Sequence, residues 1–191
     1  MTKSQADVVR AALAILDEHG ADHVTMRAIA QRLGVRMNTV LWHAKSKARL
    51  LELMADAIVG GIALDDLPEH WRDRAAEIAR RYRRGLLAHR DGAAVVAGTY
   101  AAEPATLDFA ETLVAALLAG GLSAGEAAWT CWSLVYFILG LTQEEQALPG
   151  RFSDDLSVGD RPALRRVLPM LTEASFDGRF EFGIDRLLPQ P

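Results

Sequence analysis

The segment from Val24 to Leu51 carries six basic side chains and no Asp or Glu. The whole chain is acidic, with a formal net charge of -4, so this segment concentrates positive charge in one small region. Guanidinium and ammonium groups bind phosphate oxygens, and such a basic cluster is typical of a nucleic-acid-binding surface. A solvated basic surface without a partner is the alternative. The six residues are Arg27, Arg32, Arg36, Lys45, Lys47 and Arg49.

The same segment has the pattern of two short helices joined by a glycine. Thr25 can cap the first helix with its hydroxyl, and apolar residues follow at helical spacing. Gly34 ends this helix, because glycine adopts the left-handed backbone that often follows a helix, and Val40 belongs to the second helix. Two such helices cannot bury themselves, so a third, over Gln5 to His19, must pack on them. The pattern predicts a helix-turn-helix, which favours DNA binding over a solvated surface.

The run GVRMNTVLWHAKSKARLLE, preceded by TMRAIAQRL, resembles the DNA-binding domain of the tetracycline-repressor (TetR) family of bacterial transcription regulators. Further on, LLAHRDGAAVVAGT and YFILGLTQEEQ are similar to the regulatory domain of the tetracycline repressors. The resemblance is dense in the first third of the chain and sparser beyond it. It implies an all-α fold and a repressor that binds a palindromic double-stranded DNA operator and is released by a small molecule.

The resemblance also implies which residues of the helix-turn-helix meet the DNA. Arg27 in the first helix, and Met37, Asn38 and Leu41 in the second, would face the bases. Arg can bind a guanine through two hydrogen bonds and Asn an adenine, which agrees with this assignment. The remaining predicted DNA-binding residues, mostly phosphate contacts, are Thr25, Arg36, Thr39, Trp42, His43 and Lys47.

The predicted base-reading residues depart from those of the family. A tyrosine is common in the family where Leu41 stands here. Tetracycline repressors carry glutamine and proline where this chain has Met37 and Asn38. Since these side chains face the bases, we expect an operator sequence that differs from the tetracycline operators.

Turn signals divide the chain into three parts. We expect a DNA-binding domain over residues 1–45, a linking helix over residues 46–61, and a ligand-binding and dimerisation domain over residues 62–191. Ser46 can cap the linking helix, and Gly60 and Gly61 break it. Beyond it the pattern predicts a helix from Glu69 to His89, a short helix between two glycines, helices over Pro104–Ala119 and Ser123–Glu144, a loop from Ala147 to Asp160, a short helix around Leu164–Leu171, and a last helix from Phe176 to Leu188.

The helix from Glu69 to His89 has an arginine-rich face that could be a second DNA site. Acidic residues are interleaved with the arginines, and Asp73, Glu77 and Arg81 stand four residues apart. That spacing favours a solvated face of salt bridges over a DNA contact. The residues of the opposite face, which should point inward, are Ile78, Tyr82 and Leu86.

The resemblance places a ligand pocket in the second domain. Its expected lining is aromatic and apolar with a few hydroxyls, which suits an uncharged or weakly polar aromatic effector. Tetracycline repressors have a magnesium-binding histidine at the position of Val96, so we expect no metal and no other cofactor here. The expected pocket residues are Ile78, Tyr82, Val96, Tyr100, Thr112, Trp132 and Tyr136.

The helix from Ser123 to Glu144 is apolar on almost every side, which requires burial against several neighbours. A chain of 191 residues has few places to bury such a helix, so part of its surface should meet a second subunit. In the family this helix packs with the C-terminal helix, here Phe176 to Leu188, in a four-helix bundle across a two-fold axis. We therefore expect a homodimer.

Two other functions are weighed against this one. In the first, the second domain of a DNA-binding dimer only dimerises, because the aromatic residues simply fill its core and bind no ligand. The second is an enzyme, which the sequence disfavours: no Ser stands in a nucleophile elbow, and no glycine-rich loop follows a strand. The His and Cys candidates for chemistry, which stand on separate predicted helices without ligand spacing, are His43, His70, His89 and Cys131.

The chain has no obvious membrane or export signal. No run of about 18 apolar residues lacks a charge or a turn signal, so no membrane-spanning helix is expected. The N-terminal residues MTKSQADVV lack the apolar core of a signal peptide. We therefore expect a cytoplasmic protein.

Overall fold

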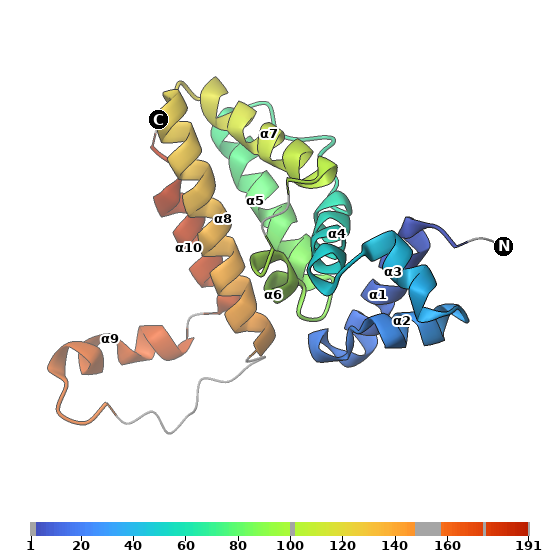
Figure 1. Cartoon of the computed structure of the whole chain (residues 1–191). Coiled ribbons are helices and arrows are strands. Elements are labelled where there is room, and N and C mark those ends of the chain that lie inside the picture. The colour runs from blue at the N-terminus through green and yellow to red at the C-terminus, as the bar shows by residue number, and fades with distance from the viewer. Residues whose placement is uncertain (1–2, 100–101, 148–157, 174, 191) are drawn as a thin grey trace.

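The computed structural model describes residues 3–99, 102–147, 158–173 and 175–190. In these ranges the chain forms ten α-helices and one 3-10 turn and has no strand, which confirms the all-α fold (Figure 1). The elements are α1 (Gln5–His19), η1 (Ala21–His23), α2 (Met26–Leu33), α3 (Met37–Ala44), α4 (Lys47–Gly60), α5 (Trp71–Leu87), α6 (Gly92–Ala97), α7 (Pro104–Ala119), α8 (Ala124–Ala147), α9 (Pro162–Glu173) and α10 (Phe176–Leu187).

The first three helices form the expected helix-turn-helix with its supporting helix. Ser4 and Asp7 cap α1 reciprocally, and the Thr25 hydroxyl accepts a hydrogen bond from the backbone N–H of Ala28 at the start of α2. Gly34 has a φ of 65°, the left-handed conformation that the turn between α2 and α3 requires. Since α1 contacts both α2 and α3, it closes the small core that two short helices cannot form alone.

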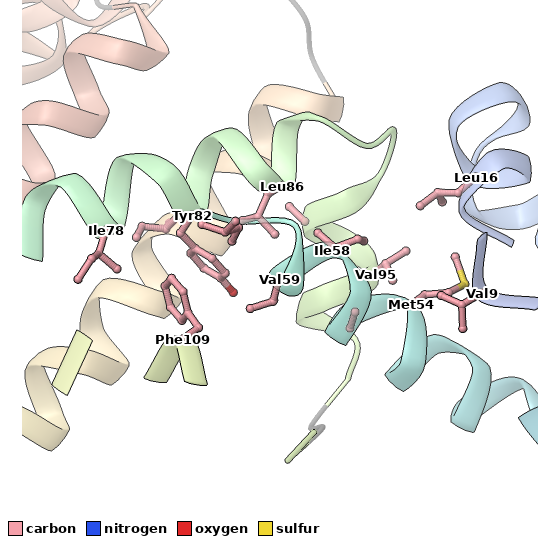
Figure 2. Packing of buried hydrophobic residues seen from close by; sticks show 14 of the residues in the cluster. Val9, Leu16, Met54, Ile58, Val59, Ile78, Tyr82, Leu86, Val95 and Phe109 are labelled. Atoms are coloured by element: carbon pink, nitrogen blue, oxygen red, sulfur yellow. The ribbon is translucent and has the colours of Figure 1, made fainter. Parts of the chain in front are cut away.

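The helix α4 joins the helix-turn-helix to the rest of the chain. It begins after the Ser46 cap and contacts α1 and α3 on one side and α5, α6 and α7 on the other. Its buried Met54 and Ile58 belong to one continuous apolar cluster that runs from α1 to Tyr82 of α5 (Figure 2). A displacement of α4 should therefore move the residues packed on it in both parts of the chain, because closely packed side chains transmit strain.

The second part is a bundle built around α5 and α8. The helix α8 contacts α5, α6, α7 and α10, and the capping box of Ser123 and Glu126 at its start is present as expected. By length and apolar composition alone, α8 passes the test for a membrane-spanning helix, so the expectation that no segment would pass was too strict. One such helix is weak evidence for a membrane span, and α8 packs on four other helices while only 22 % of its apolar window is buried.

The arginine-rich face of α5 is only partly the solvated face that the sequence predicts. Glu77 does pair with Arg81 at 2.9 Å and with Arg84 at 2.9 Å. Other arginines of α5, however, bind α10, where acidic residues recur every four positions and form a complementary stripe. The pairs are Arg72 with Asp185 at 2.9 Å, Arg80 with Glu181 at 2.8 Å, and Arg83 with Asp177 at 2.6 Å.

The predicted loop from Ala147 to Asp160 falls largely on residues 148–157, outside the described residues. After it, α9 forms where a short helix was expected, and Figure 1 shows it standing away from the helical bundle. Its apolar side chains Leu164, Val167, Met170 and Leu171 are exposed.

Candidate DNA-binding surface and regulatory cavity

The ten predicted DNA-binding residues fall on α2, on α3 with its cap, and at the start of α4, which are consecutive elements in contact. None of the ten is buried. Met37 is 49 % exposed and Trp42 is 81 % exposed, although large apolar side chains are usually buried. Exposed apolar groups on the second helix can contact the methyl group of thymine or the sugar-phosphate backbone.

The structure separates the six basic residues of this segment into two groups. Arg32 forms a two-pronged ion pair with Glu18 of α1, and Arg49 forms one with Glu103. No ion pair joins the other four to an acidic residue within the described ranges of the chain. These four, which remain available to phosphate, are Arg27, Arg36, Lys45 and Lys47.

The ends of α2 and α3 favour anion contacts. The Thr25 oxygen accepts from Ala28 at 3.1 Å, which leaves the hydroxyl proton able to donate to a phosphate. Arg36 is the N-cap of α3 and provides no side-chain cap, so the first N–H groups of α3 keep their hydrogen-bonding capacity. Helix N-termini bind phosphate through such groups and through the helix dipole.

A cavity of about 540 Å³ lies in the second part of the chain, between α4, α5, α6, α7 and α8. No charged residue is among the described residues that line it. This size and lining suit a small, largely apolar ligand. The lining residues are Ala55, Tyr82, Val96, Ala97, Thr99, Ala102, Thr106, Leu107, Ala110, Trp132, Val135, Tyr136, Leu139, Gly140 and Gln143.

Only part of the predicted pocket set lines this cavity. Tyr82, Val96, Trp132 and Tyr136 do. Two predicted residues do not: Ile78 is fully buried in the core, and the Thr112 hydroxyl donates to the Asp108 carbonyl within α7. Tyr100 is outside the described residues.

The sequence analysis missed the other eleven lining residues, which come from α4, α6, α7, α8 and the segment before α7. They include the small residues Ala55 and Thr106. Small residues such as these give no periodic signal of their own. Their place in the wall depends on how α4 and α7 cross, which no local pattern records.

Tyr82 is a buried polar group of the cavity. Its ring stacks on Phe109 with centroids 4.6 Å apart, which fixes its orientation (Figure 2). Burial raises the pKa of the Tyr82 phenol, so the group stays protonated at neutral pH and can donate a hydrogen bond. A carbonyl or hydroxyl oxygen of a ligand is a suitable acceptor.

The cavity offers an apolar side chain, Val96, where tetracycline repressors hold magnesium through a histidine. Among the described residues, no group of three or more His, Cys, Asp or Glu side chains is placed to hold a metal ion. The donors that do face the cavity are hydroxyl, phenol and amide groups, which are weak ligands for a metal without a carboxylate or imidazole.

Helices α8 and α10, which contact each other, both carry exposed aromatic side chains, and we call this set of residues the outer face. It consists of Trp129, Trp132 and Tyr136 of α8 and Phe182 of α10, and two of them, Trp132 and Tyr136, also line the cavity. Tyr136 is 62 % exposed and Phe182 is 65 % exposed. Several exposed aromatic side chains on two helices in contact are typical of a protein–protein interface. A hollow of about 620 Å³ beside Trp129 lies at one end of this face and is distinct from the cavity described above.

Two family descriptions match this chain. Residues 8–54 match "Bacterial regulatory proteins, tetR family", and residues 64–189 match "Tetracyclin repressor-like, C-terminal domain". A similar curated protein is the class A tetracycline repressor from transposon 1721 of Escherichia coli. The two are 35 % identical over an alignment of 198 positions, which takes in 96 % of this chain and 88 % of the repressor.

Solved structures agree with these matches. A possible TetR-family transcriptional regulator from Streptomyces coelicolor has a TM-score of 0.86 and 38 % identity, with 97 % of each chain covered. ActR from the same species, in complex with actinorhodin, has a TM-score of 0.87 and 26 % identity, covering 98 % of this chain and 95 % of ActR. BioQ with its double-stranded DNA operator has a TM-score of 0.72 and 29 % identity, covering 97 % of this chain and 98 % of BioQ.

The two matched segments correspond to the two parts of the structure described above. The first covers the helix-turn-helix and most of α4, and the second covers the bundle with its cavity and outer face. The relatives are transcriptional regulators and not enzymes, which agrees with the scattered His and Cys residues of this chain. The protein belongs to the TetR family of DNA-binding transcriptional regulators.

Proposed function

We propose that the protein is a repressor that binds a palindromic operator as a homodimer and is released by a small, largely apolar or aromatic effector. The observation that carries this proposal is the cavity of about 540 Å³, which has no charged group among its described lining residues and includes Ala55 of α4 in its wall. The same helix α4 contacts the DNA-binding helices α1 and α3. The cavity and the DNA-binding surface are therefore joined by one rigid element.

Two similar proteins support the two binding partners. BioQ was solved with its double-stranded DNA operator, and ActR was solved in complex with actinorhodin. For this chain, the lack of charge in the cavity favours an uncharged ring system over an anion or a cation, since an unpaired charge would lose its hydration there. Release requires a second conformer, in which α4 moves the α3 helices of the two subunits away from the two halves of the operator. The effector must bind this conformer more tightly, because a ligand that binds both conformers equally has no effect.

The operator contacts can be tested with point variants. Arg27→Ala should cost about 1 to 3 kcal/mol and relax the preference at one base pair, because arginine reads guanine through two hydrogen bonds. Lys47→Ala should weaken all duplexes alike, because a phosphate contact carries no sequence information. Duplexes selected from a random pool by the parent protein, followed by gel-shift titration, measure both effects. Arg84→Ala, an exposed arginine on α5, is the control and should change neither.

The same selection tests the symmetry of the site. Two recognition helices of a dimer should select two inverted half-sites about 34 Å apart, which is one turn of the duplex. Enrichment of no sequence over random DNA would contradict the operator-binding function.

Effector binding should not depend on a metal ion. A panel of uncharged aromatic compounds, including actinorhodin, can be screened by thermal shift, and a binding compound titrated by calorimetry with and without EDTA. We expect the same affinity in both titrations, because Val96 stands where a metal-binding histidine would be needed. A strong loss of affinity in EDTA would contradict this assignment of the cavity. If no compound of the panel shifts the melting temperature, the alternative of a purely dimerising domain is favoured.

A further inference from the structure

Two side-chain contacts join the N-terminus of α7 to α4: one is an ion pair and the other is a helix cap. Glu103 is the N-cap residue of α7, but its side chain does not cap its own helix. Its carboxylate instead accepts two hydrogen bonds from the guanidinium of Arg49 on α4, one of them 3.1 Å long. This ion pair lowers the pKa of Glu103, so the carboxylate is charged at neutral pH.

The cap that α7 lacks comes from α4. One oxygen of Asp56 accepts from the backbone N–H of Thr106 at 2.8 Å and from the Thr106 hydroxyl at 3.0 Å. A carboxylate at this position satisfies a helix N–H and interacts favourably with the positive end of the helix dipole. The α7 terminus is thus capped by a residue 50 positions earlier in the chain.

These two contacts lie on one face of α4. Arg49 and Asp56 are seven residues apart, which is close to two helical turns, so both side chains point the same way. The backbones also approach closely further along: a Cβ atom added at Gly60 of α4 would lie 3.1 Å from the Cβ of Ala105. An ion pair, a helix cap and a close backbone contact together hold the two helices in one register.

The crossing forms part of the cavity wall. Ala55 of α4, next to Asp56, lines the cavity, and so do Ala102 and Thr106 at the start of α7. A ligand in the cavity therefore touches the same threonine that binds Asp56. At its other end, α4 follows α3 after only Lys45 and Ser46, so Arg49 lies within one turn of the DNA-binding surface.

We propose that Arg49, Asp56, Glu103 and Thr106 form a latch that couples the cavity to the DNA-binding domain. They are positioning residues, which touch neither base nor phosphate but fix the angle of α4 relative to α7. This inference rests on the proposed effector cavity, because the latch links that cavity to α4. Partly exposed ion pairs contribute little to stability, so the main effect of the latch is on the orientation of α4 and not on the free energy of unfolding.

Allosteric coupling is reciprocal, so the latch can be tested without knowing the effector. If a ligand in the cavity changes operator affinity, operator binding must change ligand affinity by the same factor, and the latch predicts that it does so through the cavity wall. The measurement is amide hydrogen exchange of residues 102–110 in the free protein and in complex with a duplex selected from a random pool. In the parent protein, operator binding should change exchange at this segment by about fivefold or more, the lower end of typical coupling.

The test variants are Glu103→Gln alone and Glu103→Gln with Asp56→Asn, which keep shape but remove charge. In both, operator binding should still protect α2 and α3, while the response of residues 102–110 should be reduced in the single variant and lost in the double variant. Glu181→Gln is the matched control, because it removes a comparable partly exposed ion pair with Arg80, away from α4. The control should respond like the parent, and melting temperatures of all variants show whether folding is retained.

Two results would overturn the latch. In one, operator binding leaves residues 102–110 of the parent unchanged. In the other, the variants keep the full response. A failed effector screen, by contrast, would contradict the ligand-binding function and leave this DNA-driven measurement unaffected.

Discussion

Replacing Phe182 by glutamate should turn the dimer into monomers and lower operator affinity by about 100-fold or more. Phe182 is 65 % exposed and belongs to the outer face of α8 and α10, which we propose as the dimer interface. A carboxylate inside an apolar interface would lose its hydration without gaining a partner. Operator binding should fail together with dimerisation, since each half-site alone is held by only one recognition helix.

Sedimentation velocity and gel-shift titration of the same samples measure these two effects. Leu118→Glu is a suitable control, because Leu118 is an exposed apolar residue of α7, outside the proposed interface. This control should remain dimeric. A parent protein that sediments as a monomer at micromolar concentration would contradict the proposed interface.

From the sequence pattern, Ile184 and Leu187 would be chosen to test the interface. The structure shows that Ile184 is a poor choice, since it is 2 % exposed and lies in the core of its own chain. A charge there would unfold the α10 contact and would not report on dimerisation. Both faces of α10 carry apolar residues, and only the packing of α10 on α8 shows which face stays exposed.

Replacing Gly183 by alanine should lower the free energy of unfolding by about 1 to 3 kcal/mol. A Cβ atom at this position would lie 2.0 Å from the Cζ atom of Phe137 on α8, so α10 must move outward or the ring must turn. The Phe137 ring also stacks against Phe180, with centroids 6.3 Å apart, which limits its movement. We therefore expect α10 to loosen and the dimer to weaken as well.

Chemical denaturation at a fixed protein concentration measures this loss, because the stability of a dimer depends on concentration. The matched control is Gly125→Ala at the start of α8, where no atom lies within 4 Å of an added Cβ. Alanine is the better helix former, so this variant should gain about 0.5 to 1 kcal/mol. Equal effects of the two substitutions would show that close packing at Gly183 is not what requires glycine.

The helices and their ends could be predicted from the sequence because the forces that set them are local. Ser4, Thr25, Ser46 and Ser123 cap helices through hydrogen bonds that span three residues. Gly34 ends α2 through its own left-handed backbone. The helix-turn-helix was equally readable, since the spacing of apolar and basic residues within one short segment carries it.

The ion pair of Glu77 and Arg81, four residues apart, could be predicted, but the long-range ion pairs and the cavity could not, because they depend on residues far apart in the chain. Arg32 and Arg49 count as free positive charges in the sequence, yet the fold brings Glu18 and Glu103 to them. The arginines of α5 bind a stripe on α10 about a hundred residues later.

The residues that line the cavity show the difference between what the sequence pattern and what the tertiary structure determine. The sequence by itself determined the helices, their caps, the helix-turn-helix and the aromatic character of the second domain, and it predicts the DNA-binding residues. Only the tertiary structure decided that Thr106 lines the cavity, that Ile78 and Thr112 do not, and that Asp56 caps α7. Periodicity shows which face of a helix is apolar, but the angle at which two helices cross decides which residues meet there, and that angle depends on packing along their whole length.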